Sequence, residues 1–386
     1  MSKTPKLRFK EFSGDWEIHL LGKSITLYDN ERKPVKEQER NSGEYAYYGA
    51  TGIIDYIDDY IFEGEYLLLG EDGANIVTRN APLIYKTEGK FWVNNHAHIF
   101  KPKSKFDIDF MKHRLELINY IPYNTGTAQP KLNADSIKSI PFNAPKLEEQ
   151  EKIASFFSLI DSKISLQREK VEALKDYKTG MMQKIFSREL RFKDDEGRDY
   201  PEWEEKKLGD VGIIVTGNTP STKEKDNYGD EYLWASPADL GYKKVIDDTI
   251  NKLSFKGFDK IRKVPKGSIL ATCIGSTIGK IGMASMEMST NQQINTLICN
   301  KDINNEFVYY SLEYNFPRYL SYVTAQAVPI INKTQFQEFD INVPVLDEQI
   351  KIGKTLSKID LKIEKEQEKL DSLNQYKKGL LQQMFV

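Results

Sequence analysis

Two stretches of the chain share one spacing of apolar and charged positions, and each predicts a long helix. They cover residues 145–186 and 344–385, and at a constant offset of 199 residues they are identical at 19 of 42 positions. Apolar side chains recur at heptad-like intervals with charged side chains between them, which is typical of a coiled-coil seam on an exposed helix. The predicted seam consists of Ile153, Phe157, Ile160, Ile164, Val171, Leu174, Met181, Ile352, Leu356, Ile359, Ile363, Leu370, Leu373 and Leu380.

Each helix is expected to begin just after a proline, Pro145 or Pro344, with acidic residues in its first turn. Negative charge favours a helix start because it lies at the positive end of the helix dipole. About 39 helical residues would span roughly 58 Å, which is longer than a small domain is wide. The two helices are therefore predicted to act as spacers.

A second pair of repeated segments, termed the lead-in segments, precedes the two globular regions. The first contains Leu7-Arg-Phe-Lys10, Trp16 and Leu21-Gly22, and the second contains Leu190-Arg-Phe-Lys193, Trp203 and Leu208-Gly209. The duplication therefore covers whole half-molecules. Because the second lead-in segment follows the first helix, a two-fold relation places the N-terminal segment where the second helix ends. The order predicts an antiparallel helix pair and chain ends that lie close together.

The globular regions, about 23–144 and 210–343, predict mixed α/β structure with short strands. Strand-like runs cover residues 64–70, 81–85, 91–93, 267–274, 280–283 and 294–298. Helical stretches follow at 107–120 and 305–323, each before a polar loop, a last strand and the long helix. The predicted fold class is α+β, with two mixed α/β domains separated by two long antiparallel coiled-coil helices and internal two-fold pseudo-symmetry. The predicted segments are 1–144, 145–187, 188–343 and 344–386.

Composition narrows the class of protein. The chain has 386 residues and a net charge of −2, which argues against bulk coating of nucleic acid but allows a local basic groove. Two cysteines, Cys273 and Cys299, make no disulfide framework and indicate a reducing, cytoplasmic setting. The sequence has no apolar run of about 18 residues that would predict a membrane span. The charged first residues also lack the apolar core of a signal peptide.

One glycine-rich segment invites a nucleotide-binding interpretation. Residues 275–280, Gly-Ser-Thr-Ile-Gly-Lys, are one residue short of the phosphate-loop spacing, and Ile281 stands where a magnesium-binding serine or threonine is required. Strand-like flanks on both sides favour a turn instead, with backbone amides and Lys280 available to touch a phosphate backbone.

A matched polar segment occurs in both halves. Asn94-Asn-His-Ala-His98 in the first half corresponds to Asn291-Gln-Gln-Ile-Asn295 in the second. His96 and His98 could ligate a metal from one face of a strand, but no further ligand cluster is evident, and hydrogen bonding is the favoured interpretation. Amide and imidazole groups at a matched place can also recognise base edges. Polar strand ends of a purely structural kind are the alternative.

Basic clusters and early glycine-containing loops supply the remaining candidates for a nucleic-acid surface, with solvated loop charge as the competing interpretation. The predicted DNA-binding residues are Tyr47, Tyr48, Thr51, Asn75, Arg79, Asn95, His96, Lys101, Lys103, Lys105, Gln129, Asn218, Thr219, Ser221, Lys223, Lys263, Ser276, Thr277, Lys280, Gln292, Gln293, Asn295 and Gln326. No metal site is assigned. The chain shows no methyltransferase tetrapeptide, glycine fingerprint, nucleophile elbow or zinc-protease motif, so we expect a non-catalytic protein.

Several motifs recur together along nearly the whole chain. They are Leu7-Arg-Phe-Lys10 and its repeat, Tyr48-Gly-Ala-Thr-Gly-Ile53, Gly70-Glu-Asp-Gly73, Gly217-Asn-Thr-Pro220, Thr290-Asn-Gln-Gln293 and the two helix starts Leu147-Glu-Glu-Gln150 and Leu346-Asp-Glu-Gln349. With the repeated order of segments, they are similar to the DNA-specificity subunits of type I restriction-modification systems.

The resemblance implies two target-recognition domains, each reading one half of a bipartite, asymmetric site in double-stranded DNA, with the helices setting the distance between the halves. It also implies two modification (methyltransferase) subunits that bring S-adenosylmethionine for adenine methylation, and restriction subunits that bring ATP and Mg²⁺. No cofactor is expected on this chain. Two different heads suit a non-palindromic target, because identical heads under a two-fold axis would require a palindrome.

Two other classes of function remain open at this point. The protein could be a non-catalytic adaptor whose coiled coil and heads bind protein or glycan surfaces, in which case salt-dependent DNA binding is not expected. An enzyme with an unfamiliar site is the weaker alternative. Residues 1–146 contain 20 basic and 20 acidic side chains, so we also expect the isolated subunit to bind DNA weakly.

Overall fold

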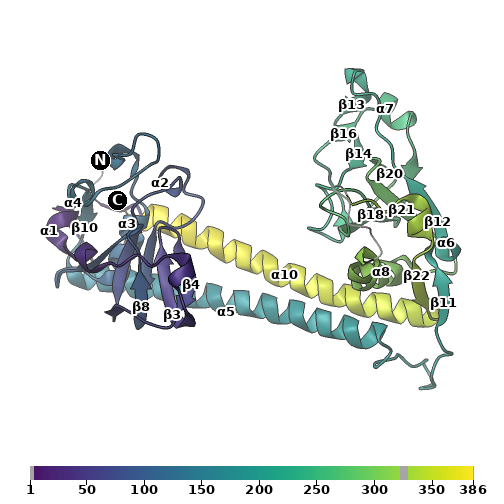
Figure 1. Cartoon of the computed structure of the whole chain (residues 1–386), viewed down its shortest axis with the longest axis horizontal. Helices are drawn as coiled ribbons and strands as arrows, with labels where there is room; N and C mark the ends of the chain where they lie inside the picture. Colours follow the sequence, from purple (N-terminus) through teal and green to yellow (C-terminus); the bar gives the residue numbers. More distant parts are fainter. Residues whose placement is uncertain (1–3, 322–328, 386) are drawn as a thin grey trace. The chain divides into compact units, whose positions relative to one another are not determined.

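The computed structural model describes residues 4–321 and 329–385 of the chain. Two compact units can be distinguished, and their helices and strands are labelled in Figure 1. Unit 1 comprises Met1–Arg168 with Glu368–Val386, and unit 2 comprises Glu169–Gln367. Each unit therefore contains one globular head together with part of both long helices, so a unit boundary falls inside each helix.

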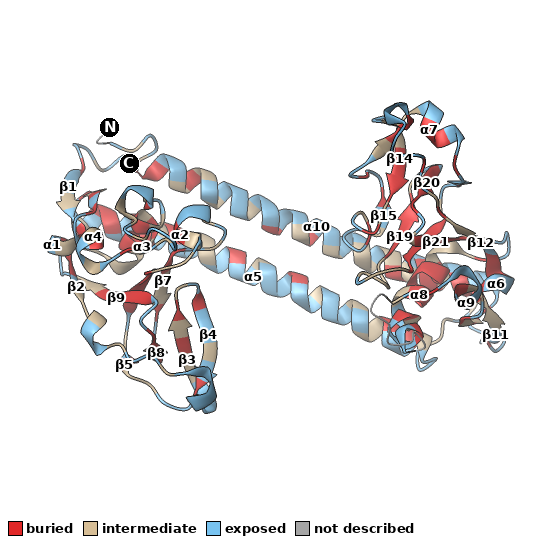
Figure 2. Cartoon of the chain, turned by 45° about the horizontal axis from the view of Figure 1, so that its top comes forward, coloured by how far each residue is buried: buried red, intermediate tan, exposed pale blue. Residues whose placement is uncertain are grey.

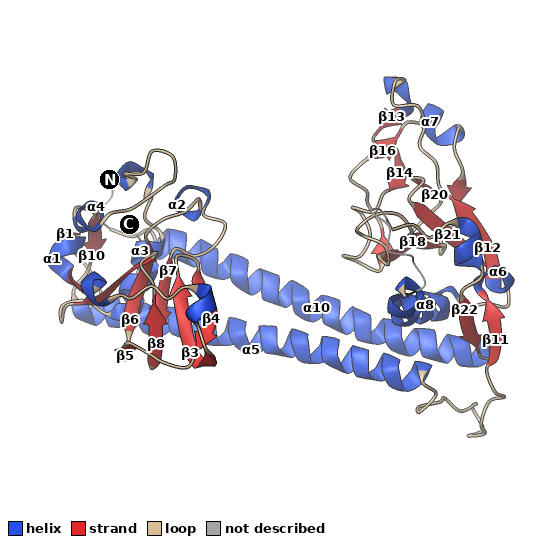
Figure 3. Cartoon of the chain, in the orientation of Figure 1, coloured by secondary structure: helices blue, strands red, loops and turns tan. Residues whose placement is uncertain are grey.

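The head of unit 1 is built on two small sheets (Figure 3). The antiparallel sheet has the order β2 (Ile25–Leu27), β9 (Ala97–Pro102), β6 (Tyr66–Gly70) and β7 (Ile84–Thr87). The other has the order β4 (Gly52–Ile57), β3 (Ser42–Gly49), β8 (Lys90–Val93) and β5 (Phe62–Glu63), with β3 and β8 parallel. The helices of this head are α1 (Leu21–Ser24), α2 (Asn75–Thr78), α3 (Ile108–Glu116) and α4 (Ala134–Lys138).

The head of unit 2 repeats this skeleton with additions. One sheet has the order β12 (Gly212–Thr216), β21 (Ile294–Cys299), β18 (Ile269–Thr272), β19 (Ile281–Ala284) and β15 (Val245–Ile246). The other has the order β13 (Tyr228–Gly229), β16 (Lys252–Leu253), β14 (Tyr232–Ala235), β20 (Met288–Thr290) and β17 (Lys263–Val264), with β14 and β20 parallel. The helices are α6 (Leu208–Val211), α7 (Phe255–Asp259), α8 (Asn305–Leu320) and α9 (Lys333–Gln337).

The predicted mixed α/β heads and their strand-like runs are confirmed, with shifted boundaries. The run at 64–70, for example, becomes β6 after a turn at Gly64, whose φ is 110°. The expected last strand before each long helix also forms. β10 (Pro141–Ala144) pairs antiparallel with β1 (Glu17–Leu20), and β22 (Asp340–Val343) pairs with β11 (Glu204–Lys207).

The long helices are α5 (Leu147–Phe186) and α10 (Leu346–Met384), and they run antiparallel in each unit. In unit 1, Phe157 packs against Phe385 with ring centroids 5.9 Å apart, and Asp161 pairs with Lys377. In unit 2, Lys170 pairs with Glu366 at 3.0 Å, and Lys178 with Asp360 at 2.9 Å. Rising numbers on one helix thus meet falling numbers on the other. Every predicted seam residue is buried or half-buried, and Figure 2 shows buried positions in red at intervals along both helices.

The lead-in segments are held to the helix starts by one repeated cluster. In unit 1, Glu149 accepts hydrogen bonds from Arg8 Nε (2.8 Å), Arg8 Nη2 (2.7 Å) and Trp16 Nε1 (3.4 Å). In unit 2, Glu348 accepts from Arg191 Nε (3.3 Å), Arg191 Nη2 (2.9 Å) and Trp203 Nε1 (3.2 Å). The glutamate of each Leu-x-Glu-Gln helix start is therefore the anchor of the preceding lead-in segment.

The chain ends meet inside unit 1, as predicted. The Leu7 amide donates to the Gln383 carbonyl at 2.9 Å, and at the matched positions of unit 2 the Leu190 amide donates to the Lys184 carbonyl at 2.9 Å. The same junction is thus made twice. In unit 2 it lies within continuous chain, whereas in unit 1 it joins the two ends of the chain.

Candidate nucleic-acid interface

Three loops meet at one edge of each head, and their backbone hydrogen bonds are the same in both units. In unit 1, the Glu71 amide donates to the His96 carbonyl (2.8 Å), and the Gly73 amide donates to Pro130 (3.0 Å). In unit 2, the Cys273 amide donates to Gln293 (2.8 Å), and the Gly275 amide donates to Pro329 (3.0 Å). The strand end after β6 or β18 thus lies between the loop before β9 or β21 and the loop before the last strand.

The predicted match between residues 94–98 and 291–295 holds at the level of hydrogen bonds. Asn94 Oδ1 accepts from the His96 amide at 2.8 Å, and Asn291 Oδ1 accepts from the Gln293 amide at 3.0 Å. Both loops are therefore turned by a buried asparagine, which presents the next two side chains at the surface.

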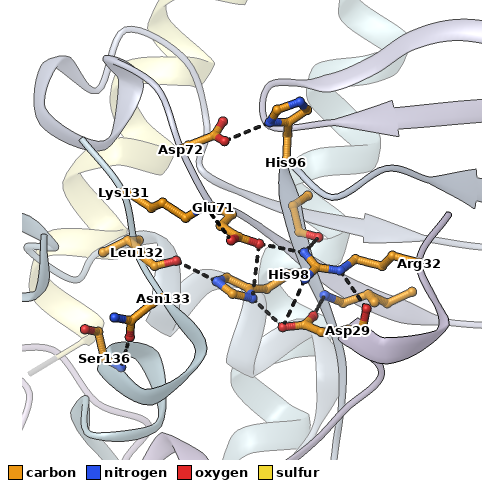
Figure 4. A network of polar contacts seen from close by, with 12 residues as sticks. Asp29, Arg32, Glu71, Asp72, His96, His98, Lys131, Leu132, Asn133 and Ser136 are labelled. Carbon is orange, nitrogen blue, oxygen red and sulfur yellow. Dashed lines mark hydrogen bonds and ion pairs between the residues drawn. The ribbon is translucent and has the colours of Figure 1, made fainter. Parts of the chain in front are cut away.

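The surface of unit 1 at this edge, termed the first rim, consists of Asp72, Asn95, His96, Gln129 and Lys131. The His96 side chain is 52% exposed, and its Nδ1 lies 2.7 Å from Asp72 Oδ2 (Figure 4). Asn95 and Gln129 are exposed, and Lys131 Nζ lies 3.2 Å from Glu71 Oε1. The first rim thus brings hydrogen-bond donors and acceptors together on one surface.

A buried histidine supports the first rim from below. His98 is 1% exposed, and its Nδ1 contacts Asp29 Oδ2 at 2.6 Å while its Nε2 contacts the Leu132 carbonyl at 2.8 Å (Figure 4). Burial alone would raise the pKa of Asp29, but hydrogen bonds from His98 and the Ile99 amide and the charge of Arg32 outweigh it, so the net shift is downward. Both ring nitrogens of His98 are engaged within the fold, which leaves neither for a metal.

An ion-pair network extends this support to the neighbouring loops. Arg32 Nη1 donates to Glu71 Oε2 at 2.7 Å and to the Ala97 carbonyl at 2.8 Å. The network therefore joins the loop after β2, the end of β6 and the start of β9 (Figure 4). A platform with fully paired polar groups positions the exposed side chains rigidly.

The surface of unit 2 at this edge, termed the second rim, consists of Asn218, Thr219, Arg262, Gln292 and Gln293. The Thr219 hydroxyl is hydrogen-bonded to Gln292 Oε1, and Asn218 Oδ1 accepts from the Arg262 amide at 3.0 Å. The Arg262 guanidinium donates to the Thr216 carbonyl at 2.6 Å. The loop after β12 is thereby fastened beside the loop before β21.

Asn295 takes the place of His98 below the second rim. It is 3% exposed, its Oδ1 accepts from Thr216 Oγ1 at 2.7 Å, and its Nδ2 donates to the Ile331 carbonyl at 3.3 Å. The prediction that Asn295 touches DNA is therefore corrected, because its amide is consumed inside the head.

Several other predicted contact residues of unit 1 are buried or bonded within the head. Tyr47 and Tyr48 belong to strand β3 rather than to a loop; Tyr47 is 1% exposed and bonds Val35, and Tyr48 is half-buried. Arg79 donates to Glu116 Oε1 at 2.6 Å, which anchors it to α3. The Asn75 side chain bonds Ala81 and Pro82 and so closes its own loop. Thr51 is exposed at the turn between β3 and β4.

The first basic cluster is at the other end of strand β9 from His96. Lys101 Nζ lies 4.0 Å from the centroid of the Tyr66 ring, and Lys103 Nζ donates to the Lys23 carbonyl at 3.0 Å. Lys105 follows in an exposed turn. These three lysines are therefore separated from the first rim by about the length of β9, roughly 20 Å.

The basic and hydroxyl candidates of unit 2 are more dispersed. Ser221 and Lys223 are exposed in the loop after Thr219, and Lys263 pairs with Asp259 at 3.0 Å. The 275–280 segment is the hairpin turn between β18 and β19, not a loop that opens a helix, and it carries Ser276, Thr277 and Lys280 at least partly exposed. The prediction of a turn is confirmed, and contact of this turn with a phosphate backbone stays a prediction. Gln326 lies outside the described residues.

Sequence reasoning missed the residues that support the rims. Arg32, Asp72 and Lys131 were not selected, although the acidic pair after β6 lies within the quoted Gly70-Glu-Asp-Gly73 motif. Arg262 directly precedes the predicted contact residue Lys263, but its proximity to Asn218 depends on folding. The spacing of these residues along the chain gives no signal for the contacts.

Comparison with known proteins finds one match in each half of the chain. A family model described as the type I restriction modification DNA specificity domain matches residues 14–176 and 200–375. A putative type I restriction enzyme specificity subunit from Haemophilus influenzae is 29% identical over 345 residues, covering 88% of this chain and 86% of that protein. The MjaVIII specificity subunit from Methanocaldococcus jannaschii is 25% identical, covering 97% and 94%.

Solved structures share the fold. The crystal structure of a type I restriction-modification S subunit from M. genitalium matches with a TM-score of 0.66 at 17% identity, covering 99% of each chain. A chain from a study of complex assembly and conformational transition of the type I R-M system matches with a TM-score of 0.56, also at 17% identity. Within the described residues, no helix is long and apolar enough to cross a membrane.

Proposed function

The chain belongs to the type I restriction-modification DNA specificity family, and from this premise we propose that each unit reads one half of a bipartite, asymmetric DNA site. The protein is a non-catalytic recognition component, and its chemistry is carried out by partner subunits. The adaptor interpretation is not favoured, because the family match covers both halves of the chain.

One observation carries the proposal. The first and second rims stand on the same backbone hydrogen bonds, yet one presents Asp72 and His96 where the other presents amides and a guanidinium. A platform shared by both units but carrying unlike side chains suits two half-sites of different sequence, read by direct contacts to base edges.

DNA affinity is expected to depend on the partner subunits. Many exposed lysines of unit 2 are already paired with carboxylates, for example Lys260 with Glu224 at 2.6 Å and Lys256 with Asp226 at 3.5 Å. Such pairs reduce the net positive charge available for phosphates. Gel shifts with and without the methyltransferase subunits test this, and tight, specific binding by the isolated subunit would contradict it.

The long helices are proposed to dock two modification subunits, which would bring S-adenosylmethionine, while restriction subunits would bring ATP and Mg²⁺. Tyr177 and Tyr376 lie at matched helix positions and are 55% and 57% exposed. Exposed aromatic side chains at equivalent places suit two copies of one partner. Tyr177→Ala with Tyr376→Ala should reduce co-purification of the methyltransferase at least about 10-fold, while Lys163→Ala, on an exposed helix position, should not.

Genome-wide mapping of adenine methylation in cells with and without the gene is the decisive experiment. Loss of one gapped, bipartite motif on deletion is the expected result. Adding one heptad to each long helix should lengthen the gap by about three base pairs, since seven residues add about 10 Å, and should leave both half-sites unchanged. An unchanged methylome in the presence of an active methyltransferase partner would refute the proposed function.

A further inference from the structure

We propose that the two rims read bases with opposite hydrogen-bond polarity at one matched position, with His96 accepting from a base amino group and Gln293 donating to a base acceptor. This deepens the proposed function, on which it rests, by naming the class of base edge that each unit recognises. In each unit, one polar group of this side chain, His96 or Gln293, is hydrogen-bonded within the unit. The other polar group is left to face a base, as an acceptor in His96 and as a donor in Gln293.

In unit 1, a carboxylate sets the tautomer of the histidine. Asp72 Oδ2 lies 2.7 Å from His96 Nδ1, and an ionised carboxylate can only accept a hydrogen bond. In the neutral ring, Nδ1 therefore carries the proton and Nε2 presents a lone pair. The side chain is 52% exposed and projects above the platform formed by His98 and Glu71 (Figure 4). The first rim thus offers an acceptor to an approaching base.

In unit 2, a backbone amide sets the orientation of the glutamine through one intermediate side chain. The Gln293 amide donates to Asn291 Oδ1 at 3.0 Å, so the other end of the Asn291 side chain is its NH₂ group. That NH₂ group donates to Gln293 Oε1 at 3.1 Å. Because a backbone N–H can only donate, turning the Asn291 side chain around would lose the hydrogen bond from the Gln293 amide, and turning the Gln293 side chain around would lose its hydrogen bond from the Asn291 NH₂ group.

The free end of Gln293 is therefore its Nε2 amino group. A Cβ atom added at Gly275 would lie 3.7 Å from this nitrogen, so the amino group lies beside the hairpin turn of the second rim. In unit 1 the same loop geometry holds His96, through Asn94 Oδ1 and the His96 amide at 2.8 Å. The loop backbone makes the same hydrogen bond in the two units. The exposed side-chain atom differs, because His96 Nε2 is an acceptor and Gln293 Nε2 is a donor.

The major groove distinguishes these two polarities. Amino groups occur on adenine N6 and cytosine N4, whereas guanine O6 and N7, adenine N7 and thymine O4 are acceptors. The half-site read by unit 1 is therefore expected to depend on one amino group, and the half-site read by unit 2 on one acceptor. Each contact should change affinity about 10-fold, at the lower end of the range for base contacts.

Binding of the full chain with its methyltransferase subunits to duplexes that carry base analogues tests the proposal. In the mapped motif, each base outside the two methylated adenines is replaced in turn by an analogue lacking its major-groove amino group or one acceptor. We expect an analogue lacking an amino group to weaken binding about 10-fold at one position of one half-site, and His96→Ala to abolish that difference. Gln293→Ala should abolish the dependence on one acceptor in the other half-site.

Two further variants separate polarity from simple loss of structure. Asp72→Asn lets the His96 ring take either tautomer, so the dependence on the amino group should fall while overall binding to the other half-site is kept. Gln293→Glu presents a second acceptor in place of the amino group, and should transfer the dependence of unit 2 from an acceptor to an amino group. Lys163→Ala, on an exposed helix position outside both rims, is the control and should leave the His96-dependent position unchanged.

The outcomes distinguish failure of the inference from failure of the proposed function. Coupling of His96 to an acceptor, coupling of Gln293 to an amino group, or no coupling of either to any position would overturn the assigned polarity while methylation of a bipartite motif continued. Absence of any bipartite motif would instead contradict the proposed function itself.

Discussion

Replacing Glu149 with glutamine should release the N-terminal lead-in segment of unit 1, whereas Glu348→Gln should leave the matched segment of unit 2 largely in place. Both glutamates anchor an arginine and a tryptophan from the lead-in segment. The two segments differ in one respect. The Leu190 amide bonds Lys184, which lies six residues earlier in the chain, whereas the Leu7 amide bonds Gln383 in the second long helix, far along the chain.

The magnitude follows from the burial of the pair. The Glu149 side chain is 3% exposed and that of Arg8 is 15% exposed, and the ionic hydrogen bonds between them keep the pKa of Arg8 above its usual value. Breaking a buried pair by neutralising one partner costs about 3–5 kcal/mol. We take about 3 kcal/mol, because Arg8 remains partly solvated, and this corresponds to about 100-fold in the opening equilibrium.

Hydrogen exchange measures this opening directly, because each segment has a reporter amide. The Leu7 amide is bonded to Gln383, and the Leu190 amide to Lys184. In Glu149→Gln, protection of the Leu7 amide should fall about 100-fold. In Glu348→Gln, protection of the Leu190 amide should also fall about 100-fold, but from a higher starting value, because a segment bonded to a neighbouring part of the chain gains less conformational entropy on opening. Equal protection of the Leu7 and Leu190 amides in the unsubstituted protein would refute this reasoning.

Three further predictions concern stability. Burial, with nearby lysines, lowers the pKa of His113 to about 4 from 6.5. The unfolded chain therefore binds this proton more tightly, and unit 1 should lose up to about 3 kcal/mol of stability as the pH falls from 6.5 to 4. In urea unfolding, His113→Tyr should flatten this dependence of stability on pH, and an unchanged dependence would contradict the prediction. Burial alone would lower the pKa of Lys178, but two neighbouring carboxylates raise it overall. The stabilisation of unit 2 by Lys178 should therefore persist from neutral pH to about 10.5 and disappear above the raised pKa. Lys178→Met should lower the free energy of unfolding by about 3 kcal/mol at pH 7. An unchanged free energy of unfolding would contradict a stabilising ion pair. Gly275→Ala should lower the free energy of unfolding by about 1–2 kcal/mol, because φ is 94° at this position. Gly73→Ala, at the matched turn with a φ of 101°, should have the same effect in thermal unfolding. A difference between the two variants would show that the turns are not equivalent.

The order of segments, the two long helices and the match between residues 94–98 and 291–295 could all be predicted from the sequence. These features depend on spacing along the chain, since heptad periodicity defines one face of a helix and an internal repeat defines which positions correspond. The anchoring role of Glu149 and Glu348 is different, because the motif is visible in the sequence but the arginine and tryptophan that it binds lie more than 130 residues away.

The placement of individual side chains was less accessible. Tyr47 and Asn295 are polar and follow plausible loop signals, yet folding buries both, and Lys101 is separated from His96 by the length of one strand. His98 and Arg32 acquire their partners from loops far apart in the chain. Sequence spacing by itself determined the duplicated framework and the positions that correspond in its two halves. Only the tertiary structure decided which side chains remain exposed and which hydrogen-bonding end they present, because the partners that occupy the other end come from distant segments brought together by folding.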